Sequence, residues 1–434
     1  EYLLDDKAES TRRFVDIEVS PILEKVEEVE EQSDEENDEQ IIKKSRGRPR
    51  LQRTGTRGRP RKVYQYTVEE GNIADVAEEI FLSEVPMRQA INSADADEWY
   101  NAMAMEIKSI IKNNTWELVE RPKDREIIGS RIVLRNKYTA DGRLERRKAM
   151  LVAQGFSQRP GIHFKETFAP VARLSTIRLL TSLAIQYGMN IRQFDVTCAY
   201  LNGELEEEIY MEPPKYLSQL LKIIQTEEDN DLGNNARQML KELCKGNKVC
   251  LLNKALYGLR QAGRSWHAKL DSELKAFGAI PTNADPCLYQ IAEKNDFTLI
   301  AIYVDDIIVA SRNSNIIDQL TNHLSQKFET KDLGEIRFCL GIEFYRTEDS
   351  ISMRQSGYIN ELLNKFGMIE SNPVCTPIVS GAKLMKSEDP PDDDLPYRKL
   401  VGALTYLSIS TRPDISFAVS YLGQFNNCYG KEHW

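Results

Sequence analysis

FTLIAIYVDDIIVAS, residues 297–311, joins two runs of β-branched and apolar side chains through a pair of aspartates. Such runs are typical of buried strands, so the stretch predicts a β-hairpin with Asp305 and Asp306 at its tip. An Asp-Asp pair in a solvated turn is ordinary. Here, apart from Ser311 at the end, only Thr298 and the two aspartates are clearly hydrophilic. Two like charges beside an apolar core indicate a site for a cation.

A second predicted strand supplies a third carboxylate. NIRQFDV, residues 190–196, follows the helical pattern of 176–187 and carries Asp195 next to its end. Three carboxylates at strand ends suit phosphoryl or nucleotidyl transfer, which needs hard divalent ions held by a few carboxylates and by substrate phosphates. Because adjacent residues of a strand point to opposite faces, we predict Asp195 and Asp305 as direct ligands in preference to Asp306.

Long motifs in a fixed order accompany the YVDD sequence of residues 303–306. They cover the chain from Ile91 to its end and read NNTWELV (113–119), HFKETFAPVARLSTIRLL (163–180), FDVTCAYLNGELEEEIYMEPP (194–214), ALYGLRQAGRSW (255–266), KDLGEIRFCLGIEF (331–344) and YRKLVGALTYLSISTRPDISFAV (397–419). Together these motifs resemble the reverse transcriptases of copia-type long-terminal-repeat retrotransposons. The resemblance implies an α+β right-hand polymerase fold with fingers, palm and the start of a thumb or connection region, preceded by a disordered charged linker.

The activity implied by the resemblance is RNA-directed DNA polymerisation. The chain is expected to extend a primer 3′-hydroxyl with deoxynucleoside triphosphates along an RNA or DNA template, with no membrane partner. Asp195, Asp305 and Asp306 are then the catalytic residues and the ligands of two Mg²⁺ ions, with Mn²⁺ as an alternative. A second hypothesis is a catalytically degenerate remnant, or a host-adopted fragment, that acts by binding A·T-rich DNA.

The resemblance also assigns residues to the incoming nucleotide. Residues 129–157 read as a basic hairpin, in which Lys148 and Arg147 would hold the triphosphate; the pattern alone equally fits an ordinary solvated hairpin. Tyr200 is placed to reject a 2′-hydroxyl, with a core tyrosine as the alternative. Gln261 is placed beside the deoxynucleotide sugar and the template base, with an exposed loop glutamine as the alternative.

Two further positions concern the primer and the triphosphate. The hairpin 338–353 matches the primer grip, in which the backbone at Leu340 and Gly341 would position the primer's 3′ end, and glycine permits close approach. The resembled family has arginine where this chain has Met150. Without that guanidinium we expect feeble polymerisation with a raised requirement for deoxynucleotide.

Composition places the chain among globular proteins with an unusual leading segment. The 434 residues are 41% hydrophobic and carry a net charge of −10, so phosphate binding must rely on local clusters of Lys and Arg. The seven cysteines show no CxxC or Cys/His ligand spacing, and no signal-like or membrane-spanning run is present. This pattern predicts free thiols and an intracellular location, and the resemblance implies a cytoplasmic virus-like particle or the nucleus.

The leading segment divides into an acidic and a basic part. Residues 24–39 hold ten acidic side chains and one Lys, which predicts disorder, and residues 43–62 hold ten basic side chains and no acidic one. RGRPR occurs twice in the basic part and resembles an AT-hook, whose arginines enter the narrow minor groove of A·T-rich duplex DNA. The arginines concerned are Arg46, Arg48, Arg50, Arg57, Arg59 and Arg61. A nuclear-localising or merely solvated basic linker is the alternative.

These observations predict three regions. Residues 1–72 form the charged linker, 91–357 the fingers and palm with an insertion at 215–248, and 358–434 a thumb or connection region that stops before a nuclease domain. Since the first residue is Glu, the chain is expected to begin inside a longer reading frame. The sequence leaves the host, the oligomeric state and the role of the insertion open.

Helical spacing of apolar residues predicts the helices that surround the strands. The expected helices cover 95–111, 266–277 with Gly278 as a cap, 316–328 behind a Ser314 N-cap, 356–366 and 396–410. In the insertion, 216–225 and 236–244 are expected to form short amphipathic helices around a polar linker.

Overall fold

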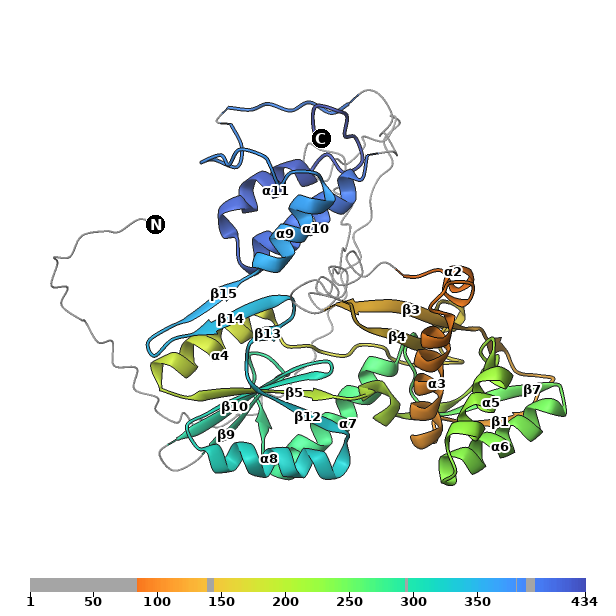
Figure 1. Ribbon diagram of the computed structural model, residues 1–434. Helices are drawn as coiled ribbons and strands as arrows, with labels where there is room; N and C mark the ends of the chain where they lie inside the picture. Colours follow the sequence, from red (N-terminus) through yellow and green to blue (C-terminus); the bar gives the residue numbers. More distant parts are fainter. Residues whose placement is uncertain (1–83, 139–143, 293–295, 380, 388–394) are drawn as a thin grey trace, which may run out of the picture. The chain divides into compact units, whose positions relative to one another are not determined.

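The computed structural model describes residues 84–138, 144–292, 296–379, 381–387 and 395–434. These residues belong to one compact unit, which spans Tyr66–Trp434. Helices and sheets alternate along them, so the predicted mixture of α and β structure is confirmed (Figure 1). The acidic segment, both RGRPR motifs and the turn of the basic hairpin at residues 140–142 lie outside the described residues.

The predicted acidic hairpin forms the middle of a 6-stranded sheet with the order β12-β5-β11-β10-β9-β8. Its strands are β12 Thr330–Glu335, β5 Asn190–Val196, β11 Asp306–Ser311, β10 Phe297–Tyr303, β9 Leu288–Ala292 and β8 Ile280–Pro281. Every neighbouring pair is antiparallel. The hairpin is therefore confirmed, and it has partner strands on both sides.

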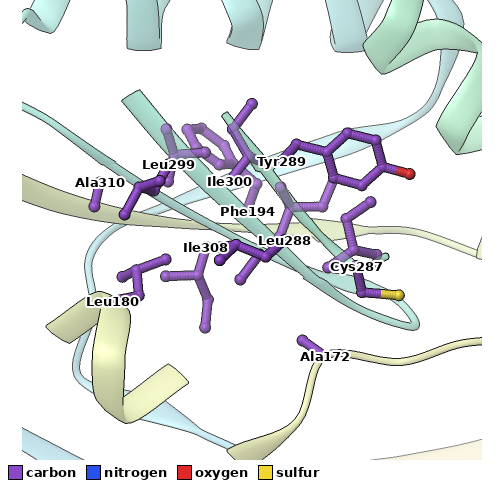
Figure 2. Packing of buried hydrophobic residues seen from close by; sticks show 14 of the residues in the cluster. Ala172, Leu180, Phe194, Cys287, Leu288, Tyr289, Leu299, Ile300, Ile308 and Ala310 are labelled. Atoms are coloured by element: carbon purple, nitrogen blue, oxygen red, sulfur yellow. The ribbon is translucent and has the colours of Figure 1, made fainter. Parts of the chain in front are cut away.

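Helices cover both faces of this sheet. In Figure 1, α4 Leu174–Gln186 lies on one face, and α7 Ala262–Phe277 and α8 Ser314–Lys327 lie on the other. Leu180 of α4, Phe194 of β5 and Ile308 of β11 belong to a single cluster of buried hydrophobic side chains (Figure 2). Burial on both faces explains the nearly continuous apolar runs in the hairpin sequence.

The hydroxyl groups inside the hairpin are satisfied internally. Thr298 and Ser311 are both buried, and the Thr298 hydroxyl donates a hydrogen bond to the Ser311 Oγ atom at 2.8 Å. Because an unpaired buried hydroxyl is costly, this pairing lets two polar residues sit in an apolar hairpin. The two aspartates at the tip are thus the remaining polar groups that need another explanation.

A second region is built on the helix α3 Ala96–Lys112, which α2 Met87–Ile91 precedes. Trp99, Met103, Ile107 and Ile110 are buried along one side of α3, as their spacing predicts. Its strands form a 4-stranded sheet and a separate ribbon. They are β1 Trp116–Glu120, β7 Lys248–Lys254, β6 Glu204–Met211 and β2 Ile127–Ile128 in the sheet, and β3 Ser130–Tyr138 and β4 Leu144–Ala153 in the ribbon.

The insertion forms two helices that join this second core. They are α5 Leu217–Glu227 and α6 Asp231–Cys244, and both helices contact α3. The prediction that residues up to 235 form a polar linker is wrong, because α6 already begins at Asp231. Asn230 explains the early start, since its side chain accepts hydrogen bonds from the backbone of Leu232 and Gly233.

Residues after the 6-stranded sheet form a third group. The small sheet β13 Phe338–Cys339, β14 Ile342–Arg346 and β15 Ile351–Arg354 contains the predicted hairpin. Helices α9 Ser356–Lys365, α10 Tyr397–Ser410 and α11 Ser416–Gly423 follow. Short 3-10 helices lie at η1 Gly155–Ser157, η2 Ala199–Asn202 and η3 Pro413–Ile415. Among the helices in the described ranges, none is long and apolar enough to cross a membrane.

The helix ends test the predicted caps. Gly278 ends α7 in a left-handed conformation with φ +102, which confirms the predicted glycine cap. The predicted Ser314 cap is wrong by one residue: Asn313 is the N-cap of α8, and its side chain accepts from the Asn315 N–H. Leu320 and Leu324 of this helix are buried as predicted, but Ile317 is buried where Ile316 was expected.

Candidate active site

The turn between β10 and β11 is held in a strained conformation. Val304 has φ +52, a left-handed value that β-branched residues rarely adopt. Its carbonyl oxygen accepts a hydrogen bond from the Trp266 Nε1–H at 2.8 Å. The next carbonyl, that of Asp305, accepts from the Val196 N–H of β5 at 3.0 Å. These bonds from two other elements stabilise a turn that the local sequence disfavours, and strain of this kind is found at functional sites.

The strand register brings the three predicted carboxylates to one end of the sheet. Asp306 of β11 lies directly opposite Asp195 of β5, and directly opposed residues share a face. Asp305 precedes β11 and occupies the turn itself, so the alternation of strand faces, from which Asp305 was preferred to Asp306 as a ligand, does not apply to it. Asp306 is the residue that shares a face with Asp195. The Gln193 amide donates to the Asp306 Oδ1 atom at 2.8 Å. Asp306 is therefore also held from the neighbouring strand.

Asp305 is the carboxylate with the most unusual surroundings. Its pKa is raised to about 7, mainly by burial and in addition by the charges of Asp195 and Asp306. The Lys148 ammonium and a hydrogen bond from Tyr257 oppose the shift. Within the described ranges, the Asp305 Oδ1 atom is buried and has no hydrogen-bond partner. Such an oxygen is costly unless a cation or a proton occupies it.

The donor set fits a hard divalent cation. Carboxylate oxygens are the ligands that Mg²⁺ prefers, and the repulsion at Asp305 would be relieved by one. Across the residues that the structure describes, no three Asp, Glu, His or Cys side chains are grouped so that they could hold one ion together. Magnesium is commonly held by one or two carboxylates together with substrate phosphates.

Tyr257 lies beside Asp305, and Tyr200 packs against Tyr257. Tyr200 of η2, the residue predicted to reject a 2′-hydroxyl, is half-buried, and its ring centroid is 4.6 Å from that of Tyr257. The Tyr257 hydroxyl donates to the Asp305 Oδ2 atom at 3.4 Å, which is long for such a bond. The predicted sugar-contacting residue is thus linked through one ring to the acidic turn.

The ribbon β3–β4 presents two different faces. Ala149 and Leu151 are buried in the core around α3, whereas Lys148 and Met150 alternate with them and are half-buried. Lys148 acts on the acidic site, because its ammonium lowers the pKa of Asp305. Met150 shares the face of Lys148 and lies outside the apolar cluster.

Arg147 is engaged elsewhere. Its guanidinium pairs with Asp95 at 2.6 Å and with Glu98 at 2.7 Å, and it lies 4.9 Å from the centre of the Trp99 ring. The side chain is only 11% exposed. In this conformation Arg147 fastens the ribbon to the start of α3, and its contact with a triphosphate stays a prediction.

Gln261 is buried, so the alternative of an exposed loop glutamine is wrong. Its Oε1 atom accepts from the Gln158 amide at 3.1 Å, and its own amide donates to the His163 carbonyl at 2.8 Å. These bonds fix the loop in front of α7. The predicted contact of Gln261 with the nucleotide sugar and template base is not tested by this arrangement.

The predicted primer-grip residues form the turn between β13 and β14. Both have left-handed backbones, with φ +51 at Leu340 and φ +71 at Gly341. The Tyr406 hydroxyl of α10 donates to the Leu340 carbonyl. A Cβ atom on Gly341 would lie 2.5 Å from that hydroxyl oxygen, so glycine is needed there for packing against α10.

Sequence reasoning missed Tyr257 and Glu106. Glu106 of α3 is half-buried, and it accepts the Leu151 N–H of β4 at 2.9 Å. Burial raises its pKa, while that hydrogen bond and Lys148 lower it. Tyr257 stands in the ALYGLRQAGRSW motif, which could have drawn attention to it. For Glu106 the signal was weak: it was a charged residue on the half-apolar side of a predicted helix.

Comparison with known proteins finds the same sequence family along most of the described chain. Residues 113–225 and 240–380 match the family described as reverse transcriptase (RNA-dependent DNA polymerase). The unmatched residues between these ranges lie in the α5–α6 insertion. The match thus includes all three carboxylates, the tyrosine pair and the turn at Leu340 and Gly341.

Individual relatives agree with this match. The Retrovirus-related Pol polyprotein from transposon TNT 1-94 of Nicotiana tabacum is 35% identical over 358 residues, which are 80% of this chain and 25% of that protein. The corresponding polyprotein from transposon RE1 of Arabidopsis thaliana is 37% identical over 349 residues, 80% of this chain and 22% of that protein. The Transposon Ty1-ER2 Gag-Pol polyprotein of Saccharomyces cerevisiae is 26% identical over 355 residues, 76% of this chain and 18% of that protein. The chain therefore spans a quarter or less of the length of these relatives.

Proposed function

This chain belongs to the reverse transcriptase family of copia-type Pol polyproteins, and on that premise we propose that it catalyses RNA-directed DNA polymerisation. The observation that carries the proposal is the acidic turn. Asp305 is buried with an oxygen that lacks a partner among the described residues, beside Asp195 and Asp306, in a strained turn fixed by Trp266. A purely structural turn would gain from losing these charges.

In the proposed reaction the primer 3′-oxygen attacks the α-phosphorus of a deoxynucleoside triphosphate. A new P–O bond forms, the α–β phosphoanhydride bond breaks, pyrophosphate leaves, and the 3′-hydroxyl gives up its proton. Two Mg²⁺ ions, or Mn²⁺ in their place, would when bound stabilise charge on the attacking and leaving oxygens. Asp195 and Asp305 would supply the main ligand oxygens, with Asp306 beside them.

The neighbouring residues would orient the substrates. Lys148 would neutralise triphosphate oxygens, with Arg147 available once it leaves its carboxylate partners. Tyr200 would exclude a 2′-hydroxyl, and Gln261 would lie beside the sugar and the template base. The backbone at Leu340 and Gly341 would then hold the primer end. In this scheme residues 91–357 are fingers and palm, and 358–434 a thumb or connection region.

Primer extension on the purified chain tests the proposal. We expect the wild type to add deoxynucleotides to a DNA primer on an RNA template, and Asp195→Asn to reduce the rate by about a thousandfold or more. Asp318→Asn is the matched control, because that aspartate is 62% exposed on α8 and pairs with Arg192. The proposal fails if the wild type does not extend the primer under any divalent-ion condition, or if Asp195→Asn extends it equally well.

A second proposed function belongs to the twin RGRPR segment, which lies outside the described residues. Ten basic residues and no acidic one occur over 43–62, with identical spacing in the two repeats. This repeated spacing favours minor-groove binding to A·T-rich duplex over a generic basic tract. It would give the chain a DNA contact that persists even if polymerisation has been lost.

Competition binding with a peptide of residues 40–65 tests this second function. Replacing Arg48 and Arg59 by Ala should remove the preference for A·T over G·C duplexes. Replacing Lys43 and Lys44 should weaken binding to both duplexes alike, because lysines outside the repeats contact only phosphates. Equal affinity of the unaltered peptide for both duplexes would reduce the segment to a solvated basic linker.

A further inference from the structure

Tyr257 connects the two residues on which nucleotide choice and chemistry depend in the proposed reaction. Its ring lies against Tyr200 with centroids 4.6 Å apart and an angle of 60° between the planes. Its hydroxyl reaches the Asp305 Oδ2 atom at 3.4 Å. One side chain therefore contacts both the residue predicted to face the sugar and the buried carboxylate of the turn.

The backbone around Tyr257 is anchored to the ribbon. The Tyr257 carbonyl accepts the Ala153 N–H at the end of β4 at 2.8 Å. Gly258 follows with φ +89, and a Cβ atom there would lie 2.2 Å from the Ala153 carbonyl oxygen. Only glycine permits so close an approach, so the position of the Tyr257 ring is coupled to the strand that carries Lys148.

The direction of the hydrogen bond is set by the two groups that form it. A phenolic O–H can donate and a carboxylate oxygen can accept, so the Tyr257 hydroxyl is the donor to the Asp305 Oδ2 atom. Hydrogen bonds to charged groups are about twice as strong as neutral ones, although the long distance here reduces the gain.

We infer that Tyr257 is a positioning residue with two separable tasks. In the ring task, its ring packs against Tyr200 and thereby sets the discrimination against ribonucleotides. In the hydroxyl task, its hydroxyl group orients the Asp305 carboxylate. The inference rests on the proposed polymerase function. The ring task predicts an effect on the choice of sugar, whereas the hydroxyl task predicts an effect on the acidic turn even without substrate.

The ring task is tested by the ratio of deoxynucleotide to ribonucleotide incorporation. Tyr257→Leu should lower this ratio by about tenfold, the scale of one lost aromatic contact. Tyr257→Phe is the matched control, because it keeps the ring, and its ratio should stay within about twofold of wild type. The ratio is measured within each variant, so a smaller folded fraction does not change it. An unchanged ratio in Tyr257→Leu overturns the ring task.

The hydroxyl task is tested by thermal unfolding of the full chain in a chelating buffer well above pH 7, where Asp305 is ionised. Tyr257→Phe should lower the unfolding temperature about twice as much in the wild-type background as in the Asp305→Asn background, because a charged acceptor makes the stronger bond. Tyr289→Phe is the control: that buried hydroxyl donates to Asp271 at 2.7 Å, and its effect should be the same in both backgrounds. Equal effects of Tyr257→Phe in both backgrounds overturn the hydroxyl task.

Activity measurements separate failure of the inference from failure of the proposed function. Tyr257→Phe should lower kcat by about threefold to tenfold with little change in the KM for deoxynucleotide, since the hydroxyl acts on the carboxylate and not on substrate binding. A wild type that never extends a primer contradicts the proposed function. The unfolding comparison then still tests whether the Tyr257 hydroxyl orients Asp305. A wild type that extends, with an unchanged Tyr257→Phe, contradicts the inference alone.

Discussion

The hairpin β10–β11 and the ribbon β3–β4 are both pairs of antiparallel strands, but they differ in what surrounds them. The hairpin lies inside a 6-stranded sheet with helices on both faces, and its register is fixed by β5 on one side and β9 on the other. The ribbon is a 2-stranded sheet with one face against α3. Charge in the hairpin is confined to its tip, whereas charge in the ribbon is spread along its outer face.

This difference shows in which of the two regions a polar side chain indicates a function. Burying a polar side chain in the hairpin costs free energy of folding, so an aspartate in the hairpin indicates a functional role. In the ribbon a polar or apolar residue on the outer face costs little, so Lys148 and Met150 are both tolerated by the fold.

The two faces of the ribbon should respond very differently to truncation. Leu151 is fully buried, and Leu151→Ala should reduce the free energy of unfolding by about 2 to 5 kcal/mol. Met150→Ala, on the next residue, should cost less than about 1 kcal/mol, because that side chain lies outside the apolar cluster. Denaturant unfolding of both variants measures the contrast. Similar losses would show that the ribbon is buried on both faces like the hairpin.

The acidic tip should be a source of instability. Since the pKa of Asp305 is about 7 in the folded chain and 3.8 is its ordinary value, folding binds a proton between these values, and wild-type stability falls as pH rises through this window. In a chelating buffer Asp305→Asn should therefore be about 2 to 4 kcal/mol more stable than wild type above pH 7.

The same gain should shrink toward zero below pH 4, where the wild-type carboxyl is protonated in both states. Thermal unfolding of wild type and Asp305→Asn across this pH range measures it. A gain that is independent of pH would mean that the substitution acts through packing and not through the buried charge.

The outer face of the ribbon should tune nucleotide affinity. Met150→Arg places a guanidinium on the same face as Lys148, and one charge-assisted contact to a triphosphate contributes about 1.5 to 3 kcal/mol, or about tenfold to a hundredfold. We expect the deoxynucleotide requirement to fall by this factor while template-primer binding stays unchanged. Met150→Leu is the control and should gain nothing. If Met150→Arg gains nothing either, the side chain at this position does not face the nucleotide.

The stability of the strained turn at Val304 should depend on the indole N–H of Trp266. Trp266→Phe keeps an aromatic ring against Phe328 but removes the N–H that the Val304 carbonyl accepts, so it should cost about 1 kcal/mol of stability. Trp116→Phe is the matched control. Trp116 is equally buried, but its Nε1–H has no partner among the residues described, so its loss should be neutral or favourable. Unfolding free energies of the two variants give the comparison.

Burial explains how much could be predicted from the sequence. The hairpin and the long helices follow from local patterns, since an apolar run or a helical spacing is visible in a few residues. The helix α3 and the glycine that ends α7 were confirmed. The errors are local as well: Asn313 and Ser314 are both good caps, and the N-cap lies at Asn313.

The remaining features depend on contacts between distant segments. Nothing in the sequence near Arg147 reveals that Asp95 and Glu98 hold it, and nothing near Gln261 reveals its burial against Gln158. The left-handed backbone conformation of Val304 could not be predicted from the sequence either, because a tryptophan from α7 stabilises it. Long-range contacts of this kind decide side-chain roles, and a local pattern carries no information about them.

The most direct test of the account measures two properties of Asp305→Asn in one preparation. If the buried charge of Asp305 serves catalysis, the variant should unfold at a higher temperature than wild type in a chelating buffer above pH 7. Its rate of primer extension should fall by about a thousandfold or more. Movement of both properties in these opposite directions is the predicted result. A variant that is more stable and extends primers as fast as wild type would contradict the account.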